Sequence, residues 1–126
     1  MVGLVAIDHV QLAMPAGAEA EAVAMGFYGG VLSLERVPKP AALAVRGGAW
    51  FRSSAGVNVH LGAEADFRPA RKAHPAFVVE GFDEICARAA SAGATLVPAD
   101  GVPGVRRVHV DDPFGNCLEL IDGGAS

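Results

Sequence analysis

Three histidines and one glutamate could together hold a metal ion, because imidazole nitrogens and a carboxylate suit Zn, Ni, Co, Mn and Fe(II). They are His9, His60, His74 and Glu119. They form no short linear motif. However, His9 and His74 each begin the first strand of one of two similar units, whereas His60 and Glu119 each lie on the last strand. We therefore expect one divalent ion between these four residues.

The first of these units reads as βαβββ. Residues 5–14 alternate in polarity as a strand, and residues 18–32 are Ala-rich and helical until Gly29 and Gly30. Three short runs follow that are typical of strands, LERV, GAWFRSS and VNVHLG, separated by Gly and Pro.

The second unit repeats this order after a polar linker at residues 63–73. PAFVVE predicts a strand, and FDEICARAASAG predicts an amphipathic helix whose apolar Phe82, Ile85 and Ala89 share a face. ATLVP, VRRVHVDD and CLELID then predict three strands, the last two joined by a tight turn at DPFGN.

Together the two units predict a single α+β domain over residues 1–126. Its modules are expected at about residues 5–62 and 74–122, because two copies are too few for a solenoid. Two curved mixed sheets, each covered by its helix on one face, can pair about a pseudo-twofold axis through their free faces. That pairing would enclose a metal-binding cavity.

Side-chain alternation places the four candidates on the free faces. If the apolar residues of each strand meet the helix, His9 opposes Val10, and Glu119 opposes Leu118 and Leu120. A carboxylate among these leucines would cost several kcal/mol unless it is paired or bound to a metal. His109 has no histidine at the matching place in the first unit, and we interpret it as structural or pocket-lining.

The composition excludes several classes of function. The formal charge is −4, and no basic cluster exceeds Arg68, Arg71 and Lys72, so a nucleic-acid partner is not expected. No apolar run approaches the ~18 residues of a membrane span, and the N-terminus lacks the basic start of a signal peptide. Cys86 and Cys117 form no CxxC pair, which favours reduced thiols in a cytoplasmic protein over a disulfide.

Over nearly its whole length the chain resembles the vicinal oxygen chelate superfamily, which includes glyoxalase I, extradiol dioxygenases, fosfomycin-resistance thiol transferases and bleomycin-binding proteins. The segments that carry the resemblance are IDHVQLAM, FYGGVLSLE, VNVHLG, AHPAFVV and DDPFGNCLELI. The resemblance implies metal ligands at His9, His74 and Glu119, with His60 in the fourth position. It also implies a homodimer, in which the first unit of one chain meets the second unit of the other. The residues themselves require only that a first and a second unit meet, which either a compact monomer or such an exchanged dimer satisfies.

Two departures from the family pattern bear on the reaction. His60 stands where bacterial glyoxalases usually carry Glu, so the site keeps a formal charge of +1 with a divalent ion and favours an anionic ligand. In a glyoxalase-like proton shift, Glu119 would then have to detach from the ion and act as the general base, or metal-bound hydroxide would. Ala13 stands where similar glyoxalases carry an Arg, so glutathione is not the expected cosubstrate.

We therefore expect a metal-dependent lyase or isomerase of glyoxalase type, acting on a small substrate chelated through two vicinal oxygens. The alternatives are an extradiol-type dioxygenase using His9, His74 and Glu119 around Fe(II), and a drug-binding or resistance module without catalysis. Fosfomycin thiol transfer ranks lower. The expected substrate-binding residues are Gln11, Trp50, Arg52, Asn58 and Arg107.

Overall fold

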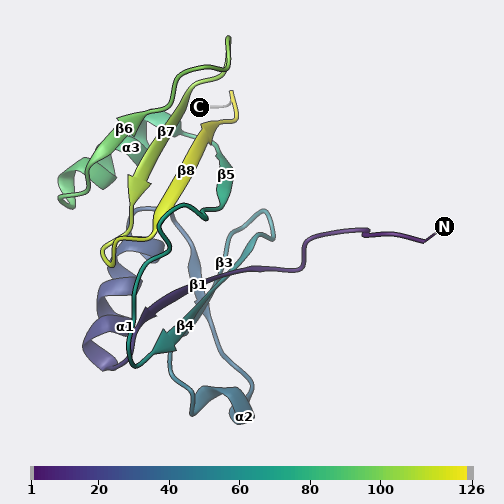
Figure 1. Cartoon of the computed structure of the whole chain (residues 1–126), viewed down its shortest axis with the longest axis vertical. Helices are drawn as coiled ribbons and strands as arrows, with labels where there is room; N and C mark the ends of the chain where they lie inside the picture. Colours follow the sequence, from purple (N-terminus) through teal and green to yellow (C-terminus); the bar gives the residue numbers. More distant parts are fainter. Residues whose placement is uncertain (1, 125–126) are drawn as a thin grey trace.

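The computed structural model describes residues 2–124 and contains two four-stranded mixed sheets (Figure 1). The strands of the first sheet are β1 (Val10–Pro15), β2 (Glu35–Val37), β3 (Ala49–Arg52) and β4 (Asn58–Glu64). Their spatial order is β1-β4-β3-β2, with β1 parallel to β4 and the other pairs antiparallel.

The second sheet repeats this topology. Its strands are β5 (Ala76–Val79), β6 (Leu96–Pro98), β7 (Arg107–Asp111) and β8 (Cys117–Asp122). Their order is β5-β8-β7-β6, and β5 is parallel to β8. The predicted α+β fold of two βαβββ modules is therefore confirmed.

Each module has one main helix. The first is α1 (Ala18–Ala24), which continues into the π-helical turn η1 (Met25–Gly29), and the second is α3 (Phe82–Ser91). α3 buries Phe82, Ile85 and Ala89, the face that the sequence predicts. A further helix of one turn, α2 (Ala41–Ala44), was not predicted, because four residues are too few to show a helical period.

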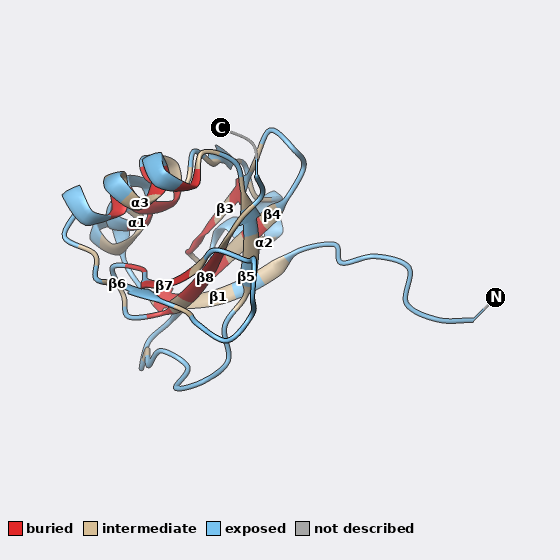
Figure 2. Ribbon diagram, turned by 90° about the horizontal axis from the view of Figure 1, so that it is seen from above, coloured by how far each residue is buried: buried red, intermediate tan, exposed pale blue. Residues whose placement is uncertain are grey.

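One apolar core joins the two modules beneath these helices. In Figure 2 the buried parts of the strands face α1 and α3. Val59, Leu61, Leu118 and Leu120 are at most 1% exposed, as alternation predicts for the helix-facing side of β4 and β8. The opposite faces of both sheets are therefore left to carry the polar candidates.

The N-terminal segment corrects one prediction. Residues 5–9 were expected to belong to the first strand, but pairing with β4 begins only at Val10, opposite Val59. The segment before it runs out from the fold as an extended tail without a neighbouring strand (Figures 1 and 2). Its apolar side chains, Val2, Leu4, Val5 and Ile7, are between 82% and 106% exposed. At the other end of the module, β4 runs to Glu64, two residues into the predicted linker.

A buried carboxylate connects the modules. Asp112, in the turn between β7 and β8, accepts a hydrogen bond of 2.7 Å from the hydroxyl of Tyr28 in η1. It also accepts bonds from the backbone N–H groups of Phe114 and Asn116. The side-chain amide of Asn116 donates both to Asp112, at 2.9 Å, and to the carbonyl of Ala13 in β1, at 2.8 Å. The turn of the second module is thus bonded to two elements of the first.

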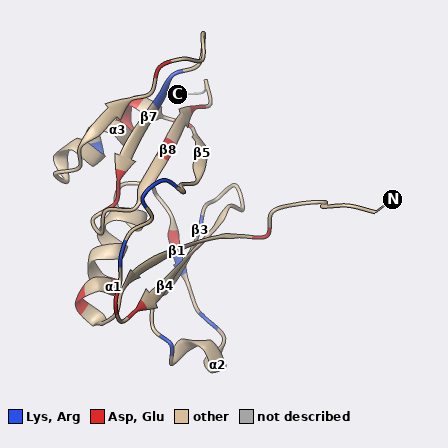
Figure 3. Cartoon of the chain, viewed as in Figure 1, with Lys and Arg blue, Asp and Glu red and all other residues tan. Residues whose placement is uncertain are grey.

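Charged residues occur in many parts of the fold. Lys and Arg residues are spread over several elements, and Asp and Glu residues occur among them (Figure 3). Within the described residues, no helix has the length and apolar character needed to cross a membrane.

Replacing Asp112 by Ala should lower the free energy of unfolding by at least about 1 to 3 kcal/mol, because it leaves buried donors without an acceptor. Urea denaturation measures this. Tyr28→Phe is the matched control, since it removes only one of the bonds and should cost less. A change below about 0.5 kcal/mol for Asp112→Ala, the range of ordinary surface substitutions, would contradict this role.

Candidate metal centre

Glu119 lies at the middle of the candidate site because β8 is a central strand of its sheet. Strand register places it opposite Ala76 of β5 on one side and His109 of β7 on the other. Its N–H donates to the carbonyl of Pro75, which brings the preceding residue, His74, beside it. Glu119 is 8% exposed as a residue, so its charge needs partners.

Arg107 supplies the main partner. Its Nη1 donates to Oε2 of Glu119 at 2.7 Å, and its Nη2 donates to the carbonyl of Asp100 at 3.1 Å. This ion pair is the largest cause that lowers the pKa of Glu119, and hydrogen bonds from His74 and His109 lower it further against the effect of burial. Glu119 is therefore a carboxylate at neutral pH.

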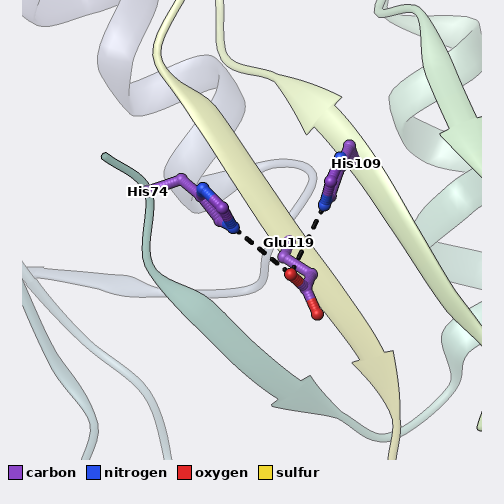
Figure 4. A group of neighbouring side chains, drawn as sticks. All are labelled: His74, His109 and Glu119. Atoms are coloured by element: carbon purple, nitrogen blue, oxygen red, sulfur yellow. Dashed lines mark hydrogen bonds and ion pairs between the residues drawn. The ribbon is translucent and has the colours of Figure 1, made fainter. Parts of the chain in front are cut away.

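Two imidazole nitrogens converge on the other oxygen. Nε2 of His74 lies 3.3 Å from Oε1 of Glu119, and Nε2 of His109 lies 3.4 Å from the same atom (Figure 4). The opposite nitrogen of His74, Nδ1, is 2.9 Å from the carbonyl of Lys72. That backbone bond, followed by the bond to Glu119, raises the pKa of His74. A hydrogen bond from Nδ1 to a carbonyl also fixes the tautomer that leaves Nε2 free for a metal.

These donors fit a divalent metal. Among residues 2–124, His74, His109 and Glu119 are the group of three or more potential ligands whose donor atoms all lie within 4.8 Å of one another. Two nitrogens and one oxygen form a set that Zn, Mn, Co, Ni and Fe(II) accept. Arg107 engages only Oε2, so Oε1 stays directed at the two imidazoles.

The first module presents a different arrangement on its free face. The ring of His60 is stacked between His9, at 4.1 Å between centroids, and Trp50, at 4.0 Å. Nδ1 of His9 is 2.8 Å from Oδ2 of Asp8. Burial, followed by the neighbouring His9, lowers the pKa of His60, so its imidazole is neutral at neutral pH and has a lone pair to offer.

The four predicted ligands thus form two pairs. His74 precedes β5, which begins only at Ala76, and lies beside Glu119 of the second sheet. His9 precedes β1 and lies beside His60 of the first sheet. His9 and His60 are not members of the cluster around Glu119. A site containing all four is therefore not assembled within this chain, and whether His9 and His60 bind a metal stays a prediction.

The predicted substrate-binding residues are divided in the same way. Gln11 and Trp50 flank His60 in the strand register, and Arg52 faces Asn58 two residues along. These four therefore share the free face of the first sheet. Arg107 lies on the second sheet, where its guanidinium is engaged with Glu119. Its Nε is buried without a hydrogen-bond partner in the described part of the chain, and whether Arg107 contacts a substrate stays a prediction.

His109 is the residue that the sequence interpretation underestimated. The first module has no histidine at the corresponding position, but the strand register identifies the corresponding residue as Trp50. Trp50 pairs with His60 as His109 pairs with Glu119. A search for matching strand positions, without requiring matching residue types, would have placed His109 beside Glu119.

A cavity of about 580 Å³ opens beside His74. It lies between β1 and the linker, and includes Gln11, Glu64, Arg68 and Asn116 in its walls. It reaches His74 alone among the predicted ligands. The cavity is therefore adjacent to the candidate metal centre and does not enclose it.

No family model matches the chain, and no curated protein matches it by sequence. Solved structures do. A glyoxalase family protein from Bacillus anthracis is 39% identical, with a TM-score of 0.86 and coverage of 97% of this chain and 98% of that one. The fosfomycin resistance protein FosX from Listeria monocytogenes is 17% identical, with a TM-score of 0.73 and coverage of 96% and 95%.

A glyoxylase/bleomycin resistance protein/dioxygenase domain from Frankia sp. EAN1pec gives 21% identity and a TM-score of 0.74, and covers 96% of this chain and 99% of that one. At such identities the likeness shows the fold alone. The fold and site define a protein of two paired βαβββ modules with a His/His/Glu group on one free sheet face. With the Bacillus anthracis protein as a relative, the chain belongs to the glyoxalase family within the vicinal oxygen chelate superfamily.

Removing the Arg107 charge should raise the pKa of Glu119 in the metal-free protein. In Arg107→Met the effect of burial is opposed only by the two histidines, so the carboxylate should titrate at higher pH. In the wild type, the pKa of Glu119 is lower in the folded state than its ordinary value of 4.5. Its contribution to stability is therefore present above that value and is lost as the pH falls through the folded pKa.

Carboxyl-carbon NMR titration measures this change. Arg106→Met is the matched control, because Arg106 pairs with Asp83 and Asp122 and not with Glu119. An unchanged Glu119 titration in Arg107→Met would show that the ion pair does not control this carboxylate.

Proposed function

We propose that this protein is a metal-dependent enzyme of glyoxalase type, a lyase or isomerase that acts on a small substrate bound through two vicinal oxygens. The observation that carries the proposal is the convergence of the His74 and His109 Nε2 atoms on one oxygen of the buried Glu119. This polar cluster occupies a sheet face with no helix over it, and such a buried charge is retained where it has a function or a partner.

A divalent ion held here would polarise the substrate oxygens and stabilise the negative charge that develops when a neighbouring C–H proton is removed. The chain supplies two groups that can move that proton. Glu119 is ionised at neutral pH, and His60 is neutral because its pKa is lowered. We assign the general base to Glu119, whose Oε1 would have to detach from the ion to accept the proton while Arg107 holds Oε2.

The first module would contribute substrate contacts. Trp50 offers an apolar ring beside His60, and the Arg52 guanidinium is exposed at the end of β3, where an anionic group can reach it. Asn58 donates to the carbonyl of Asp8 and so steadies the segment that carries His9. These contacts require the free sheet face of a first module to lie against the free sheet face of a second module.

A homodimer provides that approach. In one chain, His9 and His60 are not members of the cluster around Glu119, and a second copy would bring the free face of its first module over His74 and Glu119. The tail before β1 supports this assembly, because Val2, Leu4, Val5 and Ile7 are almost fully exposed. Val78 on the edge strand β5 is a further exposed apolar side chain, at 71%. Exposed apolar side chains in such numbers favour an interface.

An extradiol-type dioxygenase is the second candidate. The observation that favours it is the donor set itself, since two histidines and one carboxylate with open positions are typical of Fe(II) oxygenases. The protein would be loaded with Fe(II) under anaerobic conditions and then mixed with a catechol in aerated buffer. Oxygen consumption in that assay would distinguish this activity from a lyase or isomerase, which consumes no oxygen.

Protein purified without added metal should contain about one divalent ion per chain, and Glu119→Ala should contain less than about a tenth of that, because the carboxylate provides the negative ligand. Elemental analysis measures both. Glu64→Ala, which removes an exposed carboxylate at the end of β4, is the control and should retain the ion. A wild-type protein that arrives metal-free and cannot be loaded would refute the proposed function.

Mixing two inactive variants tests the shared site. His9→Ala/His60→Ala lacks the first-module histidines, and His74→Ala/Glu119→Ala lacks the second-module ligands. After subunit exchange, half of the dimers carry one of each chain, and each of those has one intact site. Activity on a thiol adduct of a 2-oxoaldehyde should therefore recover to about a quarter of the wild-type value. If wild type is active and the mixture stays inactive although exchange is complete, the site is not shared between chains.

A further inference from the structure

The position of His109 suggests more than a pocket-lining role. Glu119 has a histidine on each side of it in the sheet, His74 from the β5 side and His109 from β7 (Figure 4). Their Nε2 atoms are 3.3 and 3.4 Å from the same carboxylate oxygen. Two ligands each about 2.1 Å from one ion are about 3.0 to 3.4 Å apart in octahedral or tetrahedral geometry. Both nitrogen-to-oxygen distances therefore match those between ligands of one ion, and all three donor atoms lie within 4.8 Å of one another.

The strands hold His109 in this place. His109 and Glu119 are directly opposed across the β7–β8 pair, so their separation is set by the backbone ladder. The ring of His109 also meets the ring of His74 edge to face, with centroids 5.3 Å apart. His109 and Glu119 thus lie on paired strands of the second module, and His74 lies in the segment just before β5.

The first module has a different residue type at the position that corresponds to His109. Its counterpart, Trp50, stacks on His60 with an interplanar angle of 7°. An indole has a donor N–H and no lone pair to give to a metal. The two corresponding positions therefore differ in chemistry. The first module has the indole ring of Trp50 there, and the second module has His109, which has a nitrogen that can bind a metal.

We propose that His109 is a ligand of the metal ion, so that His74, His109 and Glu119 hold it within a single chain before any partner chain contributes. This inference rests on the proposed metal-dependent function and refines its ligand set. The His9 and His60 pair of a second copy then adds to an ion that is already bound. Two nitrogens and one oxygen from one chain are enough to bind a divalent transition metal at neutral pH.

Cobalt(II) titration of the metal-free protein tests this assignment. His109→Phe keeps an aromatic ring at the position, as the first module does, and removes only the donor nitrogens. It should weaken cobalt binding by more than the roughly 10- to 100-fold typical of losing an outer-shell partner. His9→Ala/His60→Ala should still bind about one cobalt per chain. The His109 side chain is 39% exposed, so the substitution leaves no buried void.

A spectroscopic variant gives a second readout. In His109→Cys, a thiolate at this position should produce a sulfur-to-cobalt charge-transfer band in the near ultraviolet if residue 109 contacts the ion. The wild type measures any contribution from Cys117, which lies two residues from Glu119. Val97→Cys is the matched control, because Val97 pairs with His109 but lies one strand further from Glu119. It should give no such band.

The outcomes separate this inference from the proposed function. If His109→Phe binds cobalt within twofold of wild type while His74→Ala and Glu119→Ala do not, His109 is no ligand, although the metal site stands. If His9→Ala/His60→Ala loses cobalt as completely as Glu119→Ala, the single-chain set is insufficient and the inference is wrong. If wild type itself binds no cobalt or other divalent ion, the proposed function fails as well.

Discussion

The hydrogen bonds around the Asp112 carboxylate are the contact on which the arrangement of the two modules depends. Each module alone is a four-stranded sheet with one helix, too small to bury much surface. Asp112 accepts bonds from Tyr28 of the first module and from Asn116, which itself reaches Ala13. Burial, and then the carboxylate, raise the pKa of Tyr28 far above its usual value, so its hydroxyl remains a donor at all working pH values. The turn before β8 is thereby fixed against the first module.

That turn also sets the start of β8 and thus the position of Glu119. Gly115 in the turn has φ of 92°, a conformation that favours glycine, which lets the chain reverse within five residues. β8 then runs between β5 and β7, and alternation turns Glu119 away from the core that Leu118 and Leu120 enter. The candidate site is therefore a consequence of strand order and register, with Arg107 compensating the charge that this placement buries.

Much of this could be predicted from the sequence, because polarity alternation and repeat order are local properties. Such patterns predict the βαβββ order and the buried face of α3. They also predict that the Glu119 carboxylate has a charged or metal partner. The role of His109 did not, since it depends on which strands become neighbours. The chain position of His9 predicted a strand residue, yet the ladder begins only at Val10. Which module faces meet likewise depends on packing between distant segments, and no local pattern encodes it.

The stack of Trp50 on His60 has a practical consequence. Trp50 is the single tryptophan of the chain, so nearly all indole emission comes from one ring held 4.0 Å from an imidazole that faces the candidate substrate side. Protonated imidazole quenches indole emission and neutral imidazole does so weakly, so the brightness of this one ring follows the state of His60. The protein therefore carries its own optical reporter beside His60, on the module that does not hold the His/His/Glu cluster.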